Sequence, residues 1–528
     1  MGSLPVPDAL RWWWQVSNRR DEYARAVLTL SLVVLSISWY AWLTRKSRKA
    51  DLPLPPGPRG LPLVGNLLSL HPELHVYFAE LARTYGPITK LQLGKKLGIV
   101  ITSPSLAKEV LKDHDTTFAN RDVPAAGRAA TYGGLDIVWT PYGPEWRLLR
   151  KVCVREMLGT ATLDAVYGLR QREVRRTVEY LYSRTGSQVN IGEQMFLTVL
   201  NLITSMLWGD TIKGEERSRL GAEFRQAIGE MTALLGMPNV SEFFPILARF
   251  DLQGVERKMK VLASQFDRMF DSMIHKRLNI MDEKGREESH DFLQFLLNLK
   301  DQGDAKNSLT MNQVKALLMD MVIGGTDTTS NTVEWAIAEL MNKPETMRKA
   351  QEELERVVGK DNIVEESHLP KLHYLQAVMK EVLRLHPALP LFIPHCPSSS
   401  CAVGGYMVPK GARVFVNAWA IHRDPVLWDK PLTFDPERFL IDGKWDYTGK
   451  DLSYIPFGSG RRICAGMAMA ERMVMYALAS LLHSFDWELP EGAKLQLTEK
   501  FGIVLKKATP LVAVPTPRLS DPKLYAGC

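Results

Sequence analysis

The chain of 528 residues has few cysteines and only a modest excess of positive charge. Its five cysteines form an odd, scattered set, which argues against a disulfide framework and favours a reducing compartment. With a net charge of +7 and no dense Lys/Arg stripe interleaved with aromatics, the sequence predicts no nucleic-acid partner. A mildly basic surface suits an anionic membrane face or an acidic protein partner instead. A flavin or nicotinamide fingerprint is also missing.

What the chain does contain is ordinary for a globular protein, with 45% hydrophobic and 24% charged residues. The obvious break in composition lies near the N-terminus, so we expect one large domain after a short anchor. The expected parts are an N-terminal lumenal segment at 1–25, a transmembrane helix at 26–43, a basic and proline-rich hinge at 44–60, and the main domain at 61–528.

The segment from Ala26 to Leu43 has no charged residue and is rich in Leu, Val and Ile. It is long enough to span a bilayer as a helix, which takes roughly 17–25 residues. Trp39, Tyr40 and Trp42 fit an aromatic belt at the interface, and no small-residue cleavage site follows. We therefore interpret the segment as a retained signal anchor and not as a buried core helix. Basic residues flank both of its ends, so charge alone leaves the orientation open.

The stretch Leu52–Gly60 is dense in proline, which blocks helix and holds the chain near polyproline II. Its position between anchor and main domain favours a spacer over a recognition peptide. Beyond it, alternation predicts strands at 91–93 and 98–101, and helical periodicity predicts helices at 103–113, 310–341, 343–358 and 467–485. These patterns describe a mainly helical chain with a small sheet.

A glycine-rich loop, Phe457–Gly466, carries one cysteine and runs into an apolar helix. Its glycines allow tight turns and the close approach of a flat ligand, and Arg462 supplies a fixed cation. The first amides of the helix would favour a thiolate at Cys464 over a thiol. A metal ligand, a nucleophile and a buried cysteine in a turn all stay open at this point. A dinucleotide site is excluded because its third glycine would fall at Ile463.

Five residues of this loop, Phe457, Gly460, Arg462, Cys464 and Gly466, stand at the spacing of the haem-binding loop of the cytochrome P-450 superfamily, which the stretch resembles. In that family the cysteine thiolate is the proximal iron ligand. The resemblance implies that Cys464 binds the iron of haem b and that the other four residues contact the cofactor. It also implies the family fold, mainly α with a minor β domain, in which haem lies between a long central helix and the cysteine loop.

The long central helix is predicted to start at a capping box, Thr310–Gln313. Its interior holds Gly324 and Gly325, each of which costs about 1 kcal/mol in a helix, so they either break the helix or make room for a flat ligand. The Thr-Asp-Thr-Thr cluster that follows resembles the family's oxygen-activation motif. By that resemblance Asp327 supplies protons, Thr328 is the hydroxyl that acts with it, and the glycines line the oxygen-binding cleft.

Three further side chains are predicted to reach the haem. Trp146 and Arg150 share one helical face at i and i+4, which by itself indicates only an aromatic packed under an arginine stem. The family places both members of such a pair on a haem propionate. His395, by pattern a satisfied polar group, stands at a family position that also reaches a propionate.

Glu381 and Arg384 lie on one helical face, where an exposed pair would contribute roughly a few tenths of a kcal/mol. In the family such a pair joins the arginine of a later Pro-Glu-Arg-Phe stretch, here Pro436–Phe439. The resemblance therefore assigns Glu381, Arg384 and Arg438 to a buried structural network beneath the haem, outside the chemistry.

The substrate is the least readable property of the sequence. A proline-punctuated apolar strand is predicted at Pro387–Pro394, followed much later by a turn at 501–503 that could reach back into the cavity. The residues expected to form an apolar substrate pocket are Ala388, Leu389, Leu391, Phe392, Phe501 and Ile503. Such a pocket suits a sesquiterpene-like hydrocarbon, with a flavonoid or another phenolic as the alternative.

The resemblance extends over essentially the whole chain and implies a haem-thiolate monooxygenase similar to plant microsomal members that act on terpenoids or flavonoids. Such an enzyme uses O2 and electrons from NADPH, delivered by a membrane-bound NADPH-cytochrome reductase that docks on the basic side near the cysteine. One membrane span would hold it on the endoplasmic reticulum with the catalytic domain in the cytosol. Two other classes stay open: a same-fold isomerase or dehydratase, and a haem-containing binding or sensor protein without turnover.

Overall fold

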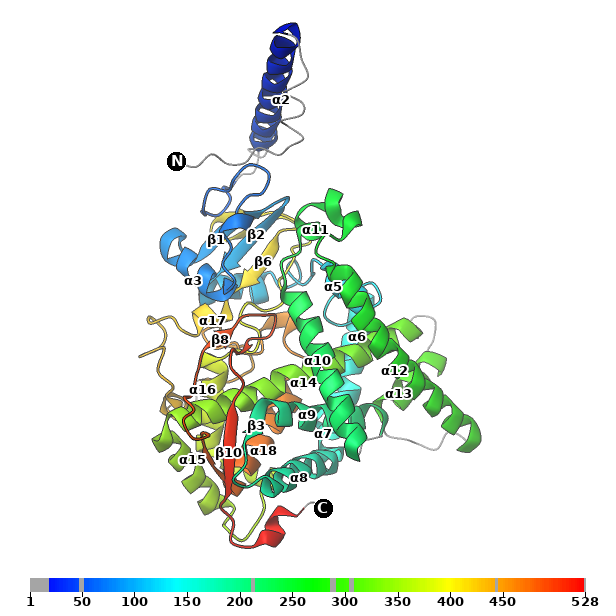
Figure 1. Ribbon diagram of the computed structural model, residues 1–528, viewed down its shortest axis with the longest axis vertical. Coiled ribbons are helices and arrows are strands. Elements are labelled where there is room, and N and C mark those ends of the chain that lie inside the picture. The colour runs from blue at the N-terminus through cyan, green and yellow to red at the C-terminus, as the bar shows by residue number, and fades with distance from the viewer. Residues whose placement is uncertain are drawn as a thin grey trace. The chain divides into compact units, whose positions relative to one another are not determined.

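The computed structural model describes residues 19–46, 52–209, 214–284, 291–302, 308–441 and 445–526. The chain divides into two units, Met1–Pro53 and Leu54–Cys528. The larger unit is mostly helical, with small sheets among its helices (Figure 1). The predicted mainly α fold with a minor β part is confirmed.

Within the smaller unit, the described residues form helix α2 (Arg19–Lys46). This helix contains the predicted span 26–43, and its side chains from Ala26 to Trp39 are exposed. Within the described ranges, no helix of the chain is both long and apolar enough to cross a membrane. Residues 1–18 of the predicted N-terminal segment and 47–51 of the predicted hinge lie outside the described residues. The membrane anchor therefore stays a prediction.

The larger unit combines long helices with short helical segments. The long helices are α3 (Leu74–Tyr85), α6 (Pro144–Val152), α8 (Tyr167–Ser183), α9 (Ile191–Trp208), α10 (Gly214–Gly236), α12 (Val255–Lys284), α13 (Phe292–Gln302), α14 (Met311–Asn342), α15 (Pro344–Val357), α16 (His373–Leu385) and α18 (Met467–Ser484). The short ones are α4 (Pro104–Lys108), α5 (Ala125–Ala130), α7 (Thr160–Ala165), α11 (Val240–Phe243) and α17 (Ala418–Ile421), with 3-10 or π segments at Leu67–Ser69, Glu109–Asp113, Cys153–Met157, Pro245–Phe250, Glu366–Lys371, Pro436–Phe439, Gly460–Arg462 and Pro522–Tyr525. The predicted helices at 310–341, 343–358 and 467–485 are confirmed, and 103–113 is α4 followed by a π segment.

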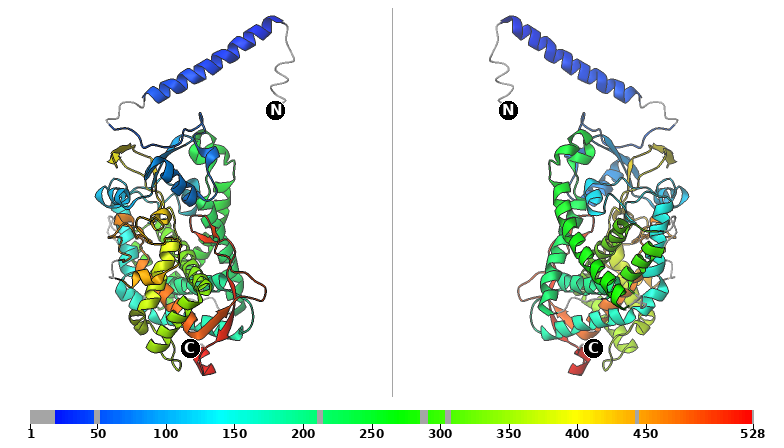
Figure 2. Two further views of the ribbon diagram at one scale, coloured as in Figure 1. Left: turned by 90° about the vertical axis from the view of Figure 1, so that its left-hand side faces the viewer. Right: turned by 90° about the vertical axis from the view of Figure 1, so that its right-hand side faces the viewer.

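The sheets are small and lie apart from one another. Strands β1 (Ile88–Leu93) and β2 (Lys96–Ile101) are antiparallel, and β6 (Arg413–Val416) lies parallel to β2. The other sheets join β3 (Val189–Asn190), β10 (Val512–Pro517) and β7 (Phe485–Glu488), β4 (Cys401–Val403) with β5 (Tyr406–Val408), and β8 (Glu499–Lys500) with β9 (Lys506–Lys507). In the views of Figure 2 the helices form the bulk of the larger unit, and the β1–β2–β6 sheet lies at the end opposite the C-terminus. The predicted strands at 91–93 and 98–101 are confirmed as parts of β1 and β2.

The predicted strand at Pro387–Pro394 is wrong. These residues are irregular, and the next residue, His395, forms an isolated bridge with Val414 of β6. Prolines at 387, 390 and 394 lack amide donors, so this segment cannot pair continuously with a neighbouring strand. Its side chains therefore do not alternate between two faces.

Helix α14 is central to the larger unit and begins at the predicted capping box. Gln313 N donates to Thr310 Oγ1 at 3.2 Å, and Thr310 N donates to Gln313 Oε1 at 2.8 Å. The helix continues through Gly324 and Gly325, which excludes the alternative of a helix break. It packs against α9, α16 and α18, whose buried side chains form much of the core. Tertiary packing thus stabilises a helix that its two glycines would weaken in isolation.

The end of the proline-rich stretch is packed onto the first sheet. Lys90 N donates to Pro56 O at 2.8 Å, and a Cβ at Gly57 would lie 2.1 Å from Lys90 O. Because such a close approach of two backbones requires glycine, this contact depends on Gly57. The larger unit accordingly begins at Leu54, inside the stretch predicted as a hinge.

Candidate active site

The larger unit contains a cavity of about 310 Å³ between α14 and the cysteine loop. The predicted site residues that line it are Arg150, Gly324, Gly325, Thr328, Ala388, Leu389, Phe392, His395, Phe457, Arg462, Cys464 and Gly466. Among the residues that the structure describes, six other predicted site residues do not line this cavity. They are Trp146, Asp327, Leu391, Gly460, Phe501 and Ile503. Residues from motifs far apart in the sequence thus meet at one cavity.

The cysteine loop takes its shape from two glycines. Gly458 and Gly460 have φ angles of +76° and +72°, in the left-handed region that favours glycine. A Cβ at Gly460 would lie 1.8 Å from Leu111 O, so a larger residue does not fit there. Cys464 N donates to Phe457 O at 2.9 Å, which closes the loop and leaves the thiol exposed to the cavity. Gly460 therefore shapes the loop and does not itself line the cavity.

The Cys464 thiol faces the cavity but is shielded from bulk solvent by surrounding protein. This burial raises the pKa of Cys464 above its ordinary value, despite the opposing effects of the Gly466 amide and of Arg150. The predicted effect of the backbone amides is thus present at Gly466, but burial outweighs it in the protein alone. A metal cation bound to the sulfur would favour the thiolate instead.

Four basic side chains line the cavity, and each is also bonded to the backbone of another segment. The bonds are Arg150 Nη2 to Ile463 O at 2.6 Å, His395 Nδ1 to Phe118 O at 2.8 Å, Arg462 to the carbonyls of Ala119, Ile137 and Thr140 at 2.7, 2.8 and 2.6 Å, and Arg121 Nη1 to Ile393 O. The buried Nε of Arg121 has no hydrogen-bond partner among the residues that the structure describes. This leaves at least one buried cationic donor available to a ligand.

The charges of these groups indicate what that ligand is. Burial, reinforced by a neighbouring arginine, lowers the pKa of Arg121 to about 9, and burial lowers that of Arg462 to about 10. The same causes hold the pKa of His395 well below its ordinary value. Cations that repel one another in a dry cavity are stabilised by an anionic ligand. The two propionates of haem supply such charge, and Cys464 lies on the same cavity to bind the iron, so the residues present fit haem.

Trp146 and Arg121 differ from the sequence prediction in opposite ways. Trp146 is buried behind Arg462, with 4.5 Å between its ring centroid and the guanidinium carbon, and its Nε1 donates to Ile137 O at 3.0 Å. It supports Arg462 and does not line the cavity. Arg121 does line the cavity, although its sequence context assigns it no role. The fold alone brings it close to His395.

The glycine pair of α14 opens one wall of the cavity. A Cβ at Gly324 would meet only open space, whereas a Cβ at Gly325 would lie 2.7 Å from Cδ1 of Ile203 on α9. A side chain at position 325 would therefore have to displace the end of the Ile203 side chain. Thr328 Oγ1 donates to Gly324 O at 2.7 Å, which directs the hydroxyl oxygen and its lone pairs toward the cavity that Thr328 lines.

Asp327 lies on a different face of α14 from Thr328. Its side chain is 7% exposed, and its carboxylate accepts from Lys506 Nζ of β9 at 2.8 Å and from Asn331 Nδ2 at 3.1 Å. The Lys506 side chain is 32% exposed, so the pair connects a buried carboxylate with the protein surface. Asp327 is therefore adjacent to the cavity and not part of its wall.

The three residues assigned to a structural network lie together. Arg384 Nε and Nη2 donate to the two carboxylate oxygens of Glu381 at 2.7 and 2.8 Å, and both side chains are 0% exposed. Arg438 Nε donates to Glu381 Oε1 at 3.2 Å. The remaining donors of Arg384 bind the carbonyls of His422, Pro431 and Thr433. This network ties α16 to the long segment that precedes the cysteine loop.

The substrate wall differs from the predicted one because residues 387–394 are irregular. Leu391 is buried beside the β1–β2 sheet, the Phe501 ring stacks on His75 at 5.2 Å, and Ile503 N lies close to Gly236. The apolar wall is completed by side chains from α9, α14 and α16 that local patterns identify only as core residues. These are Ile203, Met321, Met379 and Leu383.

Known proteins share both the sequence and the fold of this chain. The family model described as Cytochrome P450 matches residues 55–514. A flavonoid 3'-monooxygenase of Petunia hybrida is 39% identical over 518 residues, which cover 95% of this chain and 100% of the relative. The geraniol 8-hydroxylase of Catharanthus roseus is 38% identical over 500 residues, covering 94% and 99%. A zebra fish cytochrome P450 structure with progesterone has a TM-score of 0.74 at 28% identity, and the match covers 84% of this chain and 99% of that one.

Proposed function

The chain belongs to the cytochrome P450 family and is a haem-dependent monooxygenase, and we propose that it is membrane-anchored and hydroxylates an apolar plant specialised metabolite. The observation that carries the proposal is the single cavity on which the Cys464 thiol, the Thr328 hydroxyl and an apolar wall meet. The family uses haem b, O2 and electrons derived from NADPH.

Two groups of cavity residues would hold the haem: the cysteine and the four basic side chains. Cys464 binds its iron, and Arg121, Arg150, His395 and Arg462 neutralise its propionates. When bound, the haem supplies the activation of O2 and the transfer of one oxygen atom to the substrate. The protein's part is to position the substrate, keep bulk water out and deliver protons.

Proton delivery is assigned to Thr328 and Asp327. Thr328 donates its own proton to Gly324 O, so its oxygen is free to accept a hydrogen bond from the cavity. Asp327 lies next to it in the chain and reaches the surface through Lys506, which lets the carboxylate exchange protons with solvent. The two side chains together connect the solvent side of α14 with the cavity.

The first candidate substrate is a terpenoid. Ile203, Met321 and Leu389 present flexible aliphatic surface to the cavity, which suits a hydrocarbon skeleton, and a relative is named a geraniol 8-hydroxylase. A flavonoid is the second candidate, because several similar proteins are named flavonoid 3'-monooxygenases and Phe392 offers an aromatic contact.

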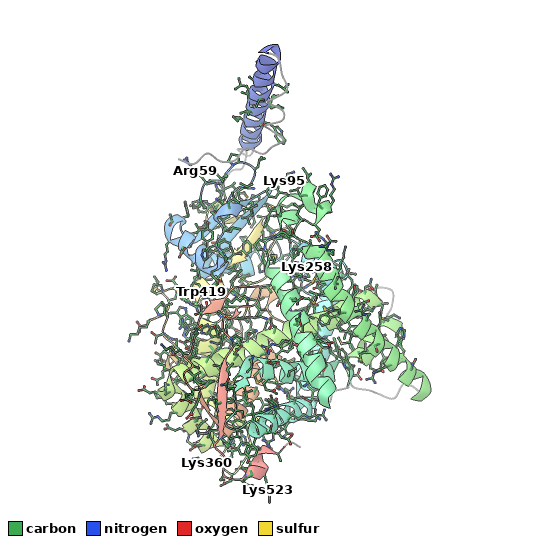
Figure 3. The ribbon with its side chains drawn as sticks, in the orientation of Figure 1. Arg59, Lys95, Lys258, Lys360, Trp419 and Lys523 are labelled. Carbon is green, nitrogen blue, oxygen red and sulfur yellow. The ribbon has the colours of Figure 1, made fainter. Side chains whose placement is uncertain are left out.

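The surface near the cysteine loop suits an acidic redox partner. The exposed basic residues there are Arg147, Lys151 and Arg461. Arg461 Nη1 donates at 3.0 Å to the hydroxyl of Tyr142, which lies just before α6. By contrast, the exposed lysines labelled in Figure 3, Lys95, Lys258, Lys360 and Lys523, lie at separate places around the larger unit. We assign the clustered charge to docking of an NADPH-cytochrome reductase.

Membrane attachment is assigned to α2. Its exposed apolar side chains include Leu30, Leu35 and Trp39, each at least 60% exposed, which is unfavourable in water and favourable in lipid. We propose a single span in the endoplasmic reticulum membrane that leaves the larger unit in the cytosol, where the reductase meets it.

The test is product analysis with microsomes that contain the full chain and a reductase, supplied with terpenes and flavonoids. The expected result is an NADPH-dependent product heavier by one oxygen atom, with label incorporated from isotopic O2. Product formed without NADPH would identify an isomerase or dehydratase. Ligand binding without NADPH consumption across the panel would identify a binding or sensor protein. Either outcome overturns the proposal.

A further inference from the structure

The β8–β9 hairpin carries Lys506, the partner of Asp327, although both of its strands are very short. Its antiparallel ladder pairs Glu499 with Lys507 and Lys500 with Lys506. A two-stranded hairpin is marginally stable at best on its own, and a ladder of this length contributes little. The position of Lys506 therefore depends on contacts between the hairpin and the rest of the larger unit.

The Glu499 side chain joins β8 to three other parts of the fold, namely α3, the end of α16 and the region of α17. Its carboxylate oxygens lie within hydrogen-bond distance of His386 Nδ1 at 2.8 Å, Trp419 Nε1 at 2.9 Å, Arg423 Nη2 at 3.1 Å and His75 Nε2 at 3.4 Å. Burial alone would raise the pKa of Glu499, but the hydrogen bonds from the two histidines and the charge of Arg423 hold it well below its ordinary value. The carboxylate therefore stays ionised, and hydrogen bonds to a charged group are stronger than neutral ones.

His386 connects Glu499 to α14. While its Nδ1 faces Glu499, its Nε2 lies 2.7 Å from Oε1 of Glu339, a buried residue of α14. Because each ring nitrogen faces a carboxylate oxygen, both contacts are hydrogen bonds only when a proton lies on each side of the ring. The ring also stacks on Trp335 of α14, with 3.7 Å between the ring centroids. The link between β8 and α14 thus runs through a side chain that is held on both edges and on one face.

The hairpin meets α14 along one row of helix positions. Asp327, Trp335 and Glu339 stand at i, i+8 and i+12, within a row of side chains spaced four residues apart. Lys506 pairs with the first of them, and Lys507 Nζ lies 4.6 Å from the ring centroid of the second. The third is reached from β8 through the imidazole described above. The two ends of the row are about 18 Å apart along the helix axis, so attachment at both ends resists sliding of the hairpin along α14.

Packing does not replace these polar contacts, because they border a second cavity. This cavity of about 540 Å³ is lined by Glu499, Glu339, His75, His386 and Arg423, together with apolar side chains. Among the described residues, the two cavities share no lining residue. Loss of the charge at position 499 would therefore leave β8 with space beside it into which it can shift.

We propose that Glu499 is a positioning residue, which holds the β8–β9 hairpin on α14 and thereby places the Lys506 ammonium against Asp327. The inference rests on the proposed role of Asp327 in proton delivery and adds the group that keeps the partner of Asp327 in place. Glu499 is not among the described residues that line the active-site cavity. Its effect on the reaction is therefore transmitted by the residues that it holds.

The experiment is a double-mutant cycle on the full-length, haem-loaded chain with a reductase, and geraniol or a hydroxyflavone as the substrate. Glu499→Gln keeps the shape of the side chain and removes its charge. It should lower the rate of product formation about three- to tenfold and raise the solvent deuterium isotope effect, as Lys506→Met does. On the Lys506→Met background the same change should lower the rate less than about twofold, because two changes that act through one contact are not additive.

Amide hydrogen exchange of residues 499–507 tests the structural step without any turnover. Leu505 N donates to Ala388 O at 2.8 Å, so the hairpin contains an amide that reports directly on its attachment. Glu499→Gln should speed exchange in this segment at least about tenfold, since a charge-assisted hydrogen bond no longer opposes local opening. Unchanged exchange would overturn the inference, whichever compounds the enzyme oxidises.

The matched control is Glu366→Gln. The Glu366 side chain is 16% exposed against 15% for Glu499, and it accepts from the buried Arg170 at 2.8 Å. Among the described residues it lines neither cavity. A purely structural loss lowers the rate by the same factor with and without Lys506, and leaves the isotope effect unchanged, as expected for Glu366→Gln.

The outcomes separate the inference from the function on which it rests. Equal effects of Glu499→Gln in the two backgrounds, with Asp327→Asn slowed, would overturn the inference alone. A wild-type rate and isotope effect in Asp327→Asn would overturn the proposed proton delivery and the inference with it. Trp419→Phe removes one donor to Glu499, and it provides the same comparison between backgrounds if Glu499→Gln does not load haem.

Discussion

Lys506 Nζ lies 2.8 Å from Oδ1 of Asp327, and this ion pair joins the late strand β9 to the middle of α14. It holds the carboxylate just outside the cavity, next to Thr328, whose hydroxyl lies inside it. Asp327 and Thr328 are adjacent in the sequence, but their side chains lie in different surroundings. Asp327 pairs with the partly exposed Lys506, and Thr328 lines the cavity in which we propose that the substrate binds.

Replacing Asp327 by Asn is expected to lower turnover on the order of 10²-fold, because the amide cannot deliver a proton. Lys506→Met should cause a smaller loss by releasing the carboxylate from its position. Both variants should show a larger solvent deuterium isotope effect on product formation. Lys500→Met is the control, since Lys500 pairs with Lys506 across the β8–β9 sheet but is exposed. An Asp327→Asn enzyme with wild-type rate and isotope effect would exclude this role.

Thr328→Ala should bind haem and substrate normally but release hydrogen peroxide in place of most of the hydroxylated product. The methyl side chain leaves no oxygen to accept a hydrogen bond at this position. The measurement is the ratio of product formed to NADPH consumed, which should fall several-fold. Thr332→Ala is the matched control, because Thr332 lines the same cavity one turn later. Equal coupling in the two variants would contradict the assignment to Thr328.

Arg384→Met should prevent stable folding or haem loading. It leaves the fully buried Glu381 carboxylate without its main partner, and loss of one partner of a buried pair costs about 3–5 kcal/mol. The expected readouts are a large fall in melting temperature and in haem content per chain. Arg348→Gln, which removes an exposed i,i+4 pair with Glu352, should change neither. A stable, fully loaded Arg384→Met protein would show that the network is dispensable.

Asp136 should make the folded chain less stable as the pH rises. Its pKa is raised to about 6 by burial, against an unfolded value of about 3.9, so the folded state binds the proton more tightly. Its contribution is thus complete below about pH 4 and is lost as the pH rises through 6, at about 1.4 kcal/mol per pH unit. Compared with Asp136→Asn, the wild type should lose melting temperature between about pH 4 and pH 6.5 and change little at higher pH. A difference that stays constant with pH would contradict this account.

Short motifs are the most predictable part of the site. Spacing within one loop or one helix determines where Cys464, Arg462, Gly324 and Thr328 lie relative to their neighbours. The resemblance to the family, and not the spacing, assigns the loop and the helix to one cavity. The strands β1 and β2 and the capping box of α14 are predictable for the same reason, since local pattern and local hydrogen bonding define them.

The rest depends on contacts between distant segments. Ile203 and Met379 look like ordinary core residues on their own helices, and only packing shows that the cavity lies between them. The prediction for Leu391 treats Pro387–Pro394 as an apolar strand beside the cavity, but this segment is irregular and Leu391 is buried beside the β1–β2 sheet. Arg121 and Glu499 belong to no motif at all. The raised pKa of Cys464 arises from burial, which the sequence of the loop does not reveal.

The central claim is that Cys464 is the iron ligand, and the spectrum of the reduced protein with carbon monoxide tests it most directly. The wild type should show the absorption band characteristic of thiolate-ligated haem. The control Cys153→Ser should keep this band, because Cys153 is buried beside Met321 and lies outside the cavity wall formed by the described residues. Cys464→Ser should lose the band entirely. An unchanged thiolate band in Cys464→Ser would contradict the account.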